Sequence, residues 1–217
     1  MKTQIDTVIF DFDGVLVNTG PDIASAANFT LQLYHLEELP QDTIISYIGG
    51  GAEMLMRRCL KEHADELIDQ VLPVFNQRYN EFCCVESHLY PDVQLILQHL
   101  KTAGKRMAIA TQKKEAATHL MIDQLGINSY FDIVVGPDSV THRKPHPESV
   151  LRILDSTSTP AGRAVVVGDM PSDIQAGKAA GTFTCGVFYG YGPQQDILAA
   201  APDLTVDRLS QLLDWME

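Results

Sequence analysis

The stretch Thr7-Val8-Ile9-Phe10-Asp11-Phe12-Asp13-Gly14 decides the fold, because a short apolar run ends abruptly at two aspartates. Residues 7–10 show no helical periodicity and are mostly β-branched or aromatic, which is typical of a strand that is buried on both faces. A parallel sheet with helices on both sides buries its strands in this way. The stretch therefore predicts a strand of an α/β protein, with Asp11 and Asp13 at its carboxyl end.

Four similar apolar runs follow farther along the chain, at residues 106–110, 133–135, 164–167 and 184–187. Segments with helical periodicity and closing glycines or small residues lie between these runs, at residues 91–104, 114–125 and 172–180. Strands that alternate with helices of about 10 to 15 residues are typical of βαβ units. We therefore predict an α/β fold with a Rossmann-like parallel sheet.

The segment 21–88 interrupts this alternation. It contains no convincing strand, and its stretches of helical periodicity are residues 23–35, 42–48, 52–63 and 65–84. A block of helices inserted after the first strand indicates a second, smaller domain. We predict a core domain made of residues 1–16 and 89–217, and an inserted all-helical domain made of residues 17–88.

The composition excludes several classes of protein. The 217 residues include 16 Lys+Arg and 28 Asp+Glu, and the formal net charge of −12 repels nucleic acids and acidic lipid surfaces. No apolar run approaches the roughly 20 residues that span a bilayer, and no signal peptide is expected. The four cysteines form no zinc-binding or C-x-x-C pattern, so we expect reduced thiols in a cytoplasmic protein. Neither a nucleic acid nor a membrane is predicted as a partner.

Polar side chains gather where the predicted strands end, which is where open α/β sheets bind their ligands. After Asp11 and Asp13, the later strands are followed by Thr111, Gln112, Lys113, Lys144, Asp169 and Asp173. Each alone has a simple structural explanation, such as a turn, a helix cap or a solvated charge. Asp169 and Asp173, four residues apart, would share a face if both were helical. Together, however, these residues indicate a functional site with four carboxylates, a hydroxyl and an ammonium group.

The chain resembles the haloacid dehalogenase-like hydrolases, in particular the phosphatases with an all-helical cap inserted after the first strand. The four motifs of these enzymes correspond to residues 11–17, Thr111, Arg143-Lys144-Pro145, and Gly168-Asp169 with Asp173. Within the superfamily the chain is most similar to the phosphoglycolate phosphatases, through residues 20–24, 48–52, 90–91 and 189–192. The resemblance runs through essentially the whole chain and implies that residues 17–88 form a cap domain.

The resemblance also implies the roles of the carboxylates. Asp11 would attack the phosphate ester and form an aspartyl-phosphate, while Asp13 would protonate the leaving group and then activate water. Mg²⁺ would be bound by Asp11, Asp169 and the main-chain carbonyl of Asp13, and Asp173 would support the bound ion or its water. The cation is needed because a phosphate ester dianion repels an attacking carboxylate.

Three further residues are implied to bind the phosphoryl oxygens: Thr111, Gln112 and Lys144. Two positions depart from the pattern of the family. Asn18 stands where related sequences often have Asp, and Gln112 stands where phosphoglycolate phosphatases usually have Asn. Neither departure removes a catalytic group, so they bear on the substrate more than on the reaction.

Asp13 favours phosphoryl transfer over dehalogenation, since a halide leaving group needs no proton. We predict a Mg²⁺-dependent phosphatase, acting as a monomer or homodimer on a small phosphorylated metabolite such as 2-phosphoglycolate. An inorganic pyrophosphatase or a sugar-phosphate mutase of the same superfamily is the alternative. A catalytically idle binding module is the rival from another class, but it would have no use for Asp13.

Several polar residues outside the motifs have two interpretations. The glycines 49–51 either bring main-chain N–H groups to an anionic ligand or form a flexible turn. Arg57 and Arg58 are candidates for pairing with a substrate carboxylate, although solvated helix positions are favoured. His142 and His146, on either side of Lys144, are interpreted as loop residues rather than ligands.

Overall fold

The computed structural model describes residues 3–216, and the chain folds into two compact units. The first unit comprises the chain up to Val17 and from Leu89 onward, and the second comprises Asn18–His88. This division differs by one residue from the sequence-based boundary between residues 16 and 17. The chain leaves and re-enters the first unit through β2 (Val17–Asn18) and β3 (His88–Leu89), which pair as a two-stranded sheet.

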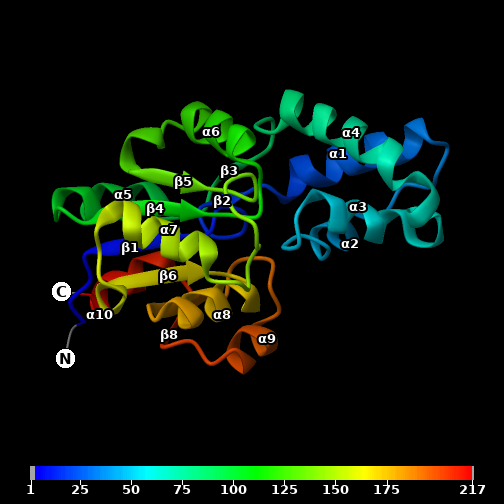
Figure 1. Ribbon diagram of the computed structural model, residues 1–217. Coiled ribbons are helices and arrows are strands. Elements are labelled where there is room, and N and C mark those ends of the chain that lie inside the picture. The colour runs from blue at the N-terminus through cyan, green and yellow to red at the C-terminus, as the bar shows by residue number, and fades with distance from the viewer. Residues whose placement is uncertain (1–2, 217) are drawn as a thin grey trace. The chain divides into compact units, whose positions relative to one another are not determined.

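A six-stranded parallel sheet forms the centre of the first unit, within the described residues, in the order β5-β4-β1-β6-β7-β8 (Figure 1). Its strands are β1 (Thr7–Phe10), β4 (Arg106–Ala110), β5 (Ile133–Val135), β6 (Ala164–Gly168), β7 (Phe183–Val187) and β8 (Leu204–Val206). The first five confirm the predicted strands, each to within one residue at either end. The predicted fold class, a Rossmann-like parallel sheet, is confirmed.

Helices cover both faces of this sheet. They are α5 (Val93–Thr102), α6 (Glu115–Gln124), α7 (Glu148–Thr157), α8 (Pro171–Ala180), α9 (Gln194–Ala199) and α10 (Leu212–Trp215), with short 3₁₀ turns η2 (Asn128–Tyr130), η3 (Ala161–Arg163) and η4 (Leu209–Gln211). The predicted helices correspond to α5, α6 and α8. All four residues of β1 are buried, and successive side chains of a strand point to opposite faces. Both faces of β1 are therefore covered, as its composition predicts.

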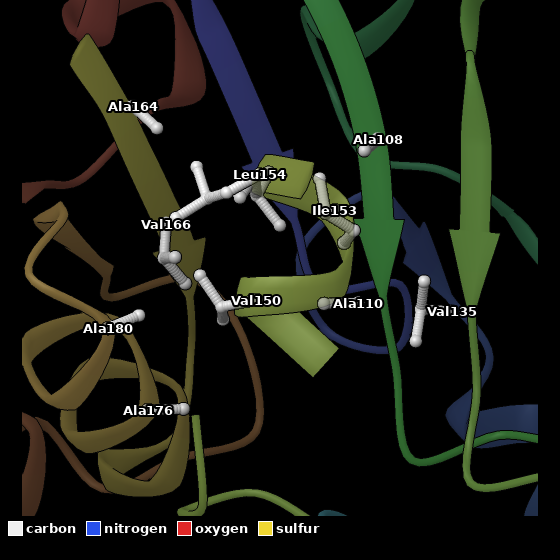
Figure 2. Packing of buried hydrophobic residues seen from close by; sticks show 11 residues of the cluster. Ala108, Ala110, Val135, Val150, Ile153, Leu154, Ala164, Val166, Ala176 and Ala180 are labelled. Carbon is white, nitrogen blue, oxygen red and sulfur yellow. The ribbon is translucent and has the colours of Figure 1, made fainter. Parts of the chain in front are cut away.

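One hydrophobic cluster joins the sheet to α7 and α8 (Figure 2). Ile9 of β1 and Val166 of β6 pack with Val150 and Ile153 of α7. The cluster is rich in alanine: Ala108, Ala110, Ala164, Ala176 and Ala180. Such small side chains allow the helices to lie close to the strands. This packing fixes the start of α7 and of α8, and both helices follow loops that carry predicted site residues.

The second unit is helical, with α1 (Gly20–Leu33), α2 (Gln41–Ile45), α3 (Ala52–Leu60), the 3₁₀ turn η1 (Lys61–His63) and α4 (Ala64–Phe82). The predicted helix 52–63 ends as an α-helix at Leu60. Asp22 of α1 ties the beginning of this unit to its end: its carboxylate accepts N–H groups from residues 85–87 at 2.8–3.1 Å and the Ser87 hydroxyl at 2.7 Å. This buried carboxylate is satisfied entirely within the unit.

The four cysteines are not joined in disulfides, and Cys59, Cys83 and Cys185 are buried. Burial raises the pKa of Cys185 to about 12, so this group stays a neutral thiol. No helix in residues 3–216 has the length and apolar character that a membrane span needs.

The strand order creates a switch point at the carboxyl end of β1. From β1 the sheet grows through β4 and β5 on one side, and through β6, β7 and β8 on the other. In open α/β sheets, ligands bind where the strand order reverses in this way. The loops after β1, β4 and β6 therefore meet at the expected binding edge.

Candidate active site

Asp11 lies directly after β1, at the switch point. Its main-chain N–H donates to the carbonyl of Val167 at 2.9 Å, which continues the pairing of β1 with β6 for one residue. The residue is 9% exposed. Gly14 then turns the chain with φ of +84°. A sheet bond thus fixes the backbone of Asp11, and its carboxylate lies at the edge of the sheet.

Lys144 is the buried cation that connects the loops of this edge. Its ammonium group donates to the carbonyl of Ala110 at 2.8 Å and to Asp173 Oδ1 at 2.5 Å. It also lies 3.1 Å from Asp11 Oδ1, as an ion pair whose angles do not make a hydrogen bond. A single ammonium group therefore brings together the ends of β1 and β4 and the first turn of α8, as convergence of the motifs requires.

Asp169 and Asp173 are both almost completely buried, each 1% exposed. The condition for a shared helical face, that both be helical, is not met, because α8 begins at Pro171 and Asp169 precedes it. Asp173 Oδ2 instead accepts the N–H of Met170 at 3.0 Å and so caps the helix, while Oδ1 binds Lys144. Both oxygens of Asp173 are thus used by the protein, which suits a supporting role.

The segment 189–192 encloses Asp169. The main-chain N–H of Tyr191 donates to Asp169 Oδ2 at 2.7 Å. A Cβ atom on Gly14 would lie 2.2 Å from this same oxygen, and one on Gly190 would lie 2.4 Å from Asp169 Cβ. Only glycine fits at both positions. Residues 189–192 carry part of the family resemblance, but their sequence does not show that they hold the carboxylate, because the N–H group that does so belongs to the backbone.

Two buried carboxylate oxygens at this edge have no hydrogen-bond partner: Asp11 Oδ1 and Asp169 Oδ1. Oxygen atoms of Asp11, Asp169 and Asp173 all lie within 4.8 Å of one another. Buried polar atoms are nearly always hydrogen-bonded. These two oxygens, which lack a hydrogen bond, therefore indicate a binding site for a positively charged group. A hard divalent cation prefers oxygen ligands of this kind, and the residues present therefore fit Mg²⁺.

Burial dominates the electrostatics of the cluster. Burial raises the pKa of Asp11 to about 7. The Lys144 ammonium lowers this pKa, whereas the negative charges of Asp173 and Asp13 raise it further. Burial likewise raises the pKa of Asp169 well above its ordinary value. For Lys144 burial acts in the opposite direction, but the carboxylates of Asp11 and Asp173 outweigh it and raise the pKa of the ammonium group. The negative charge of the cluster is therefore costly without an additional cation.

Residues 111–113 follow β4 and are shaped by local hydrogen bonds. The hydroxyl oxygen of Thr111 accepts the N–H of Lys113 at 3.1 Å, and Thr111 is buried. The side-chain amide of Gln112 donates to the carbonyl of Lys144 at 3.0 Å. The amide of Gln112 thus holds the Lys144 loop, a contact that sequence analysis did not predict.

Lys113 was placed at the end of a strand by the sequence but was given no role in the site. Its ammonium group lies 2.9 Å from Asp13 Oδ1, and its side chain is 8% exposed. The only signal was its place two residues after Thr111 at the end of a strand. Its neighbour Lys114 is exposed and precedes α6 as the N-cap residue, so the sequence alone did not distinguish the two lysines.

In the second unit, the polar residues singled out in the sequence have local partners. Arg57 pairs with Glu53 at 3.0 Å and with Asp65 at 3.1 Å. Arg58 donates to the carbonyl of Tyr47 at 3.1 Å. Gly51 caps α3 with φ of +84°. These contacts are those of an exposed helical surface and its turn.

Comparisons with known proteins place the chain in a family. The model of the haloacid dehalogenase-like hydrolases matches residues 8–187. The chain is 36% identical to the phosphoglycolate phosphatase of Colwellia psychrerythraea, with 98% of each chain covered. It is 35% identical to the phosphoglycolate phosphatase of Aquifex aeolicus, with 97% of this chain and 96% of the relative covered.

A solved structure of a predicted phosphoglycolate phosphatase from Haemophilus somnus is similar over 98% of both chains, with a TM-score of 0.91 and 29% sequence identity. These matches confirm the resemblance that the motifs predicted, and with it the enzyme class of phosphoric monoester hydrolases. The chain belongs to the haloacid dehalogenase-like hydrolases.

Proposed function

We propose that this protein is a Mg²⁺-dependent phosphatase that hydrolyses a small phosphate monoester through an aspartyl-phosphate on Asp11. The observation that carries the proposal is the pair of buried oxygens on Asp11 and Asp169 that receive no hydrogen bond, together with the buried Lys144 ammonium that forms an ion pair with Asp11. A site that combines open carboxylate oxygens with a fixed ammonium group suits a cation and a phosphate dianion together.

Asp11, Asp169 and the main-chain carbonyl of Asp13 would hold the cation, and Asp173 would support them. Mg²⁺, when bound, offsets the negative charge of the phosphate and of the carboxylates. Asp173 contributes by fixing Lys144, because its two oxygens bind the ammonium group and the N–H of Met170.

In the first chemical step, a carboxylate oxygen of Asp11 attacks the phosphorus atom and the ester P–O bond breaks. Asp13 donates its proton to the leaving alkoxide, which departs as an alcohol. In the second step, Asp13 takes a proton from a water molecule, whose oxygen attacks the phosphorus and releases Asp11 and inorganic phosphate. The ion pair with Lys113 holds the side chain of Asp13 in a defined position between these steps.

Thr111, Gln112 and Lys144 would bind the phosphoryl oxygens. We assign the Gln112 contact to its main-chain N–H, because its side-chain amide is bound to the carbonyl of Lys144. Lys144 would contribute its charge, and its three protein contacts keep the ammonium group in place before the substrate arrives.

The named relatives support 2-phosphoglycolate, or a similarly compact monoester, as the substrate. We assign residues 17–88 to the cap domain that selects it, and residues 1–16 and 89–217 to the catalytic core. A cytoplasmic monomer or homodimer that acts on a small phosphorylated metabolite completes the proposal.

The test is steady-state release of inorganic phosphate from a panel of phosphate monoesters and pyrophosphate, with and without Mg²⁺. We expect Mg²⁺-dependent release, fastest with 2-phosphoglycolate or another compact ester. Asp11→Asn should lower kcat by at least about 10³-fold while the protein stays folded, because the amide is a poor nucleophile. Substantial residual turnover in this variant would refute the covalent mechanism.

Other outcomes identify the alternatives. Preference for pyrophosphate would indicate a pyrophosphatase, and consumption of a sugar phosphate without net phosphate release would indicate a mutase. Absence of Mg²⁺-dependent release from every ester would favour the idle binding module.

A further inference from the structure

A second group of metal-ligating side chains lies outside the catalytic carboxylates, in the loop that carries Lys144 and at the start of α7. It consists of His142, His146 and Glu148, and one ligand atom from each lies within 4.8 Å of the other two. His142 Nδ1 is 3.1 Å from Glu148 Oε2, and His146 Nδ1 is 3.9 Å from the same oxygen. The two imidazole rings lie 4.5 Å apart between centroids.

These separations are close to those around a bound transition metal. With metal–ligand bonds of about 2.0–2.2 Å in tetrahedral geometry, ligand atoms lie roughly 3.3 Å apart. The two distances to Glu148 Oε2 lie on either side of this value. The exposed His146 ring must move closer to Glu148 Oε2 for the three side chains to occupy three corners of a tetrahedron around an ion.

Hydrogen bonds hold the three side chains beside one another. Glu148 accepts the main-chain N–H groups of Thr141 and His142 at 2.8 and 2.9 Å, which fix its carboxylate next to the two rings. The main-chain N–H of Glu148 donates to His146 Nδ1 at 3.3 Å, and His142 Nδ1 is hydrogen-bonded to Glu148 Oε2 at 3.1 Å. These two contacts must be exchanged for metal bonds when an ion binds. The cluster offers a carboxylate and imidazole nitrogens.

We propose that His142, His146 and Glu148 form a binding site for a divalent transition-metal ion of the Zn²⁺ class, separate from the Mg²⁺ site. Imidazole nitrogen with one carboxylate suits Zn²⁺ or Cu²⁺, whereas Mg²⁺ prefers oxygen ligands alone. The side chains of His142 and His146 are 62% and 49% exposed, so an ion reaches the site from solvent and water completes its coordination.

The site has a structural consequence for the loop that it joins. His142 and His146 stand two residues before and two residues after Lys144, and Glu148 is the first residue of α7. A metal ion bound to all three would link both sides of the Lys144 loop to the helix. Zn²⁺ binding should therefore raise the unfolding temperature of the protein through mass action.

The test measures Zn²⁺ binding by equilibrium dialysis at neutral pH, in an excess of Mg²⁺ that occupies the catalytic carboxylates. We expect one bound Zn²⁺ per chain in the wild-type protein. His142→Asn combined with His146→Asn should weaken binding by more than about 100-fold, because removal of direct ligands costs more than the 10- to 100-fold lost with outer partners. His119→Asn, which changes an exposed histidine of α6, is the matched control and should bind normally.

Two further measurements test the third ligand and the presence of nitrogen ligands. Glu148→Gln should weaken Zn²⁺ binding and abolish the rise in unfolding temperature. Cu²⁺ bound to the wild-type protein should show nitrogen hyperfine coupling in its electron paramagnetic resonance spectrum. The proposal is overturned if the double histidine variant binds Zn²⁺ as tightly as the wild type, if the wild type retains none in excess Mg²⁺, or if the Cu²⁺ spectrum lacks nitrogen coupling.

Discussion

Both units of the molecule bury aspartates, but they compensate the charge differently. In the helical unit, Asp22 is 4% exposed and receives N–H groups from residues 85–87 and a hydroxyl. At the sheet edge of the other unit, Asp11 and Asp169 each keep one buried oxygen that receives no hydrogen bond.

The difference separates a carboxylate that the protein satisfies by itself from two that keep an oxygen open to the proposed cation. Neutral donors satisfy Asp22, which gains nothing from a further ligand. Asp11 and Asp173 share the ammonium group of Lys144, and Asp13 pairs with Lys113. The buried carboxylates of this edge are under-compensated without a further cation. Function at such a site is maintained at some cost to stability, whereas the Asp22 contacts serve stability alone.

Lys144→Met, which removes the cation paired with Asp11 and Asp173, should have the largest effect. We expect a loss of about 3–5 kcal/mol in the free energy of unfolding, because buried carboxylates lose their charged partner. We also expect kcat to fall by at least about 10³-fold. Urea unfolding and phosphate release measure the two effects.

The double variant Lys144→Met with Asp173→Asn is the control for this prediction. It should recover part of the stability and none of the activity. If the single variant unfolds like the wild type, the ammonium group does not compensate the carboxylates.

Asp22→Ala should have the next largest effect. The N–H groups of residues 85–87 lose their acceptor, so we expect the free energy of unfolding to fall by about 2–3 kcal/mol. The rise in unfolding temperature on adding Mg²⁺ should stay as in the wild type, since Asp22 holds no cation. Loss of that Mg²⁺ effect would contradict the assignment of Asp22 as purely structural.

The stability of the metal-free protein and its affinity for Mg²⁺ should both depend on pH through Asp11. Its pKa of about 7 lies above the ordinary 3.8, so between about pH 4 and pH 7 the folded, metal-free protein keeps a proton that the unfolded chain releases. The contribution of Asp11 to stability therefore falls as pH rises through this range. The same proton must leave when a cation binds, so the affinity for Mg²⁺ should drop about tenfold per pH unit below pH 7.

Isothermal titration calorimetry with Mg²⁺ at pH 6, 7 and 8 measures this effect. Asp22→Asn, as a control at the other buried aspartate, should show the same pH dependence as the wild type. A constant Mg²⁺ affinity from pH 8 to pH 6 would rule out proton competition at Asp11.

Asp169→Asn should change the free energy of unfolding least, and it should raise this free energy where the other variants lower it. The pKa of Asp169 is raised by burial and by Asp11 and Asp173, so its charge is unfavourable in the metal-free protein at pH 8. The neutral amide should raise the free energy of unfolding by about 1 kcal/mol without metal, and abolish stabilisation by Mg²⁺. Thermal unfolding with and without Mg²⁺ tests both parts; a destabilised metal-free variant would show that the charge is already compensated.

Much of the fold was predictable because buried parallel strands have a strong sequence signal. Residues 8–10 and 107–110 are continuous apolar runs, and they lie in the strands Thr7–Phe10 and Arg106–Ala110. By contrast, β8 is only Leu204-Thr205-Val206 between two aspartates, which is too short a run to recognise. Helix α7 was not predicted, although Val150, Ile153 and Leu154 are spaced to face the sheet.

The candidate site was predictable residue by residue but not contact by contact. Asp11, Lys144 and Asp169 were expected at one edge, since each follows a strand. The ion pair of Lys113 with Asp13 joins two loops far apart in the chain and has no local signal.

The sequence by itself determined which residues meet at the carboxyl edge of the sheet, because apolar strands set where each loop begins. Tertiary structure alone decided how their charges are compensated: Asp22 is satisfied across 63 to 65 residues of sequence, and Lys144 donates to a carbonyl 34 residues away. Hydrogen bonds of this kind depend on the position of backbone groups in space. No pattern along the chain reveals them, and they determine which buried carboxylate remains open to a ligand.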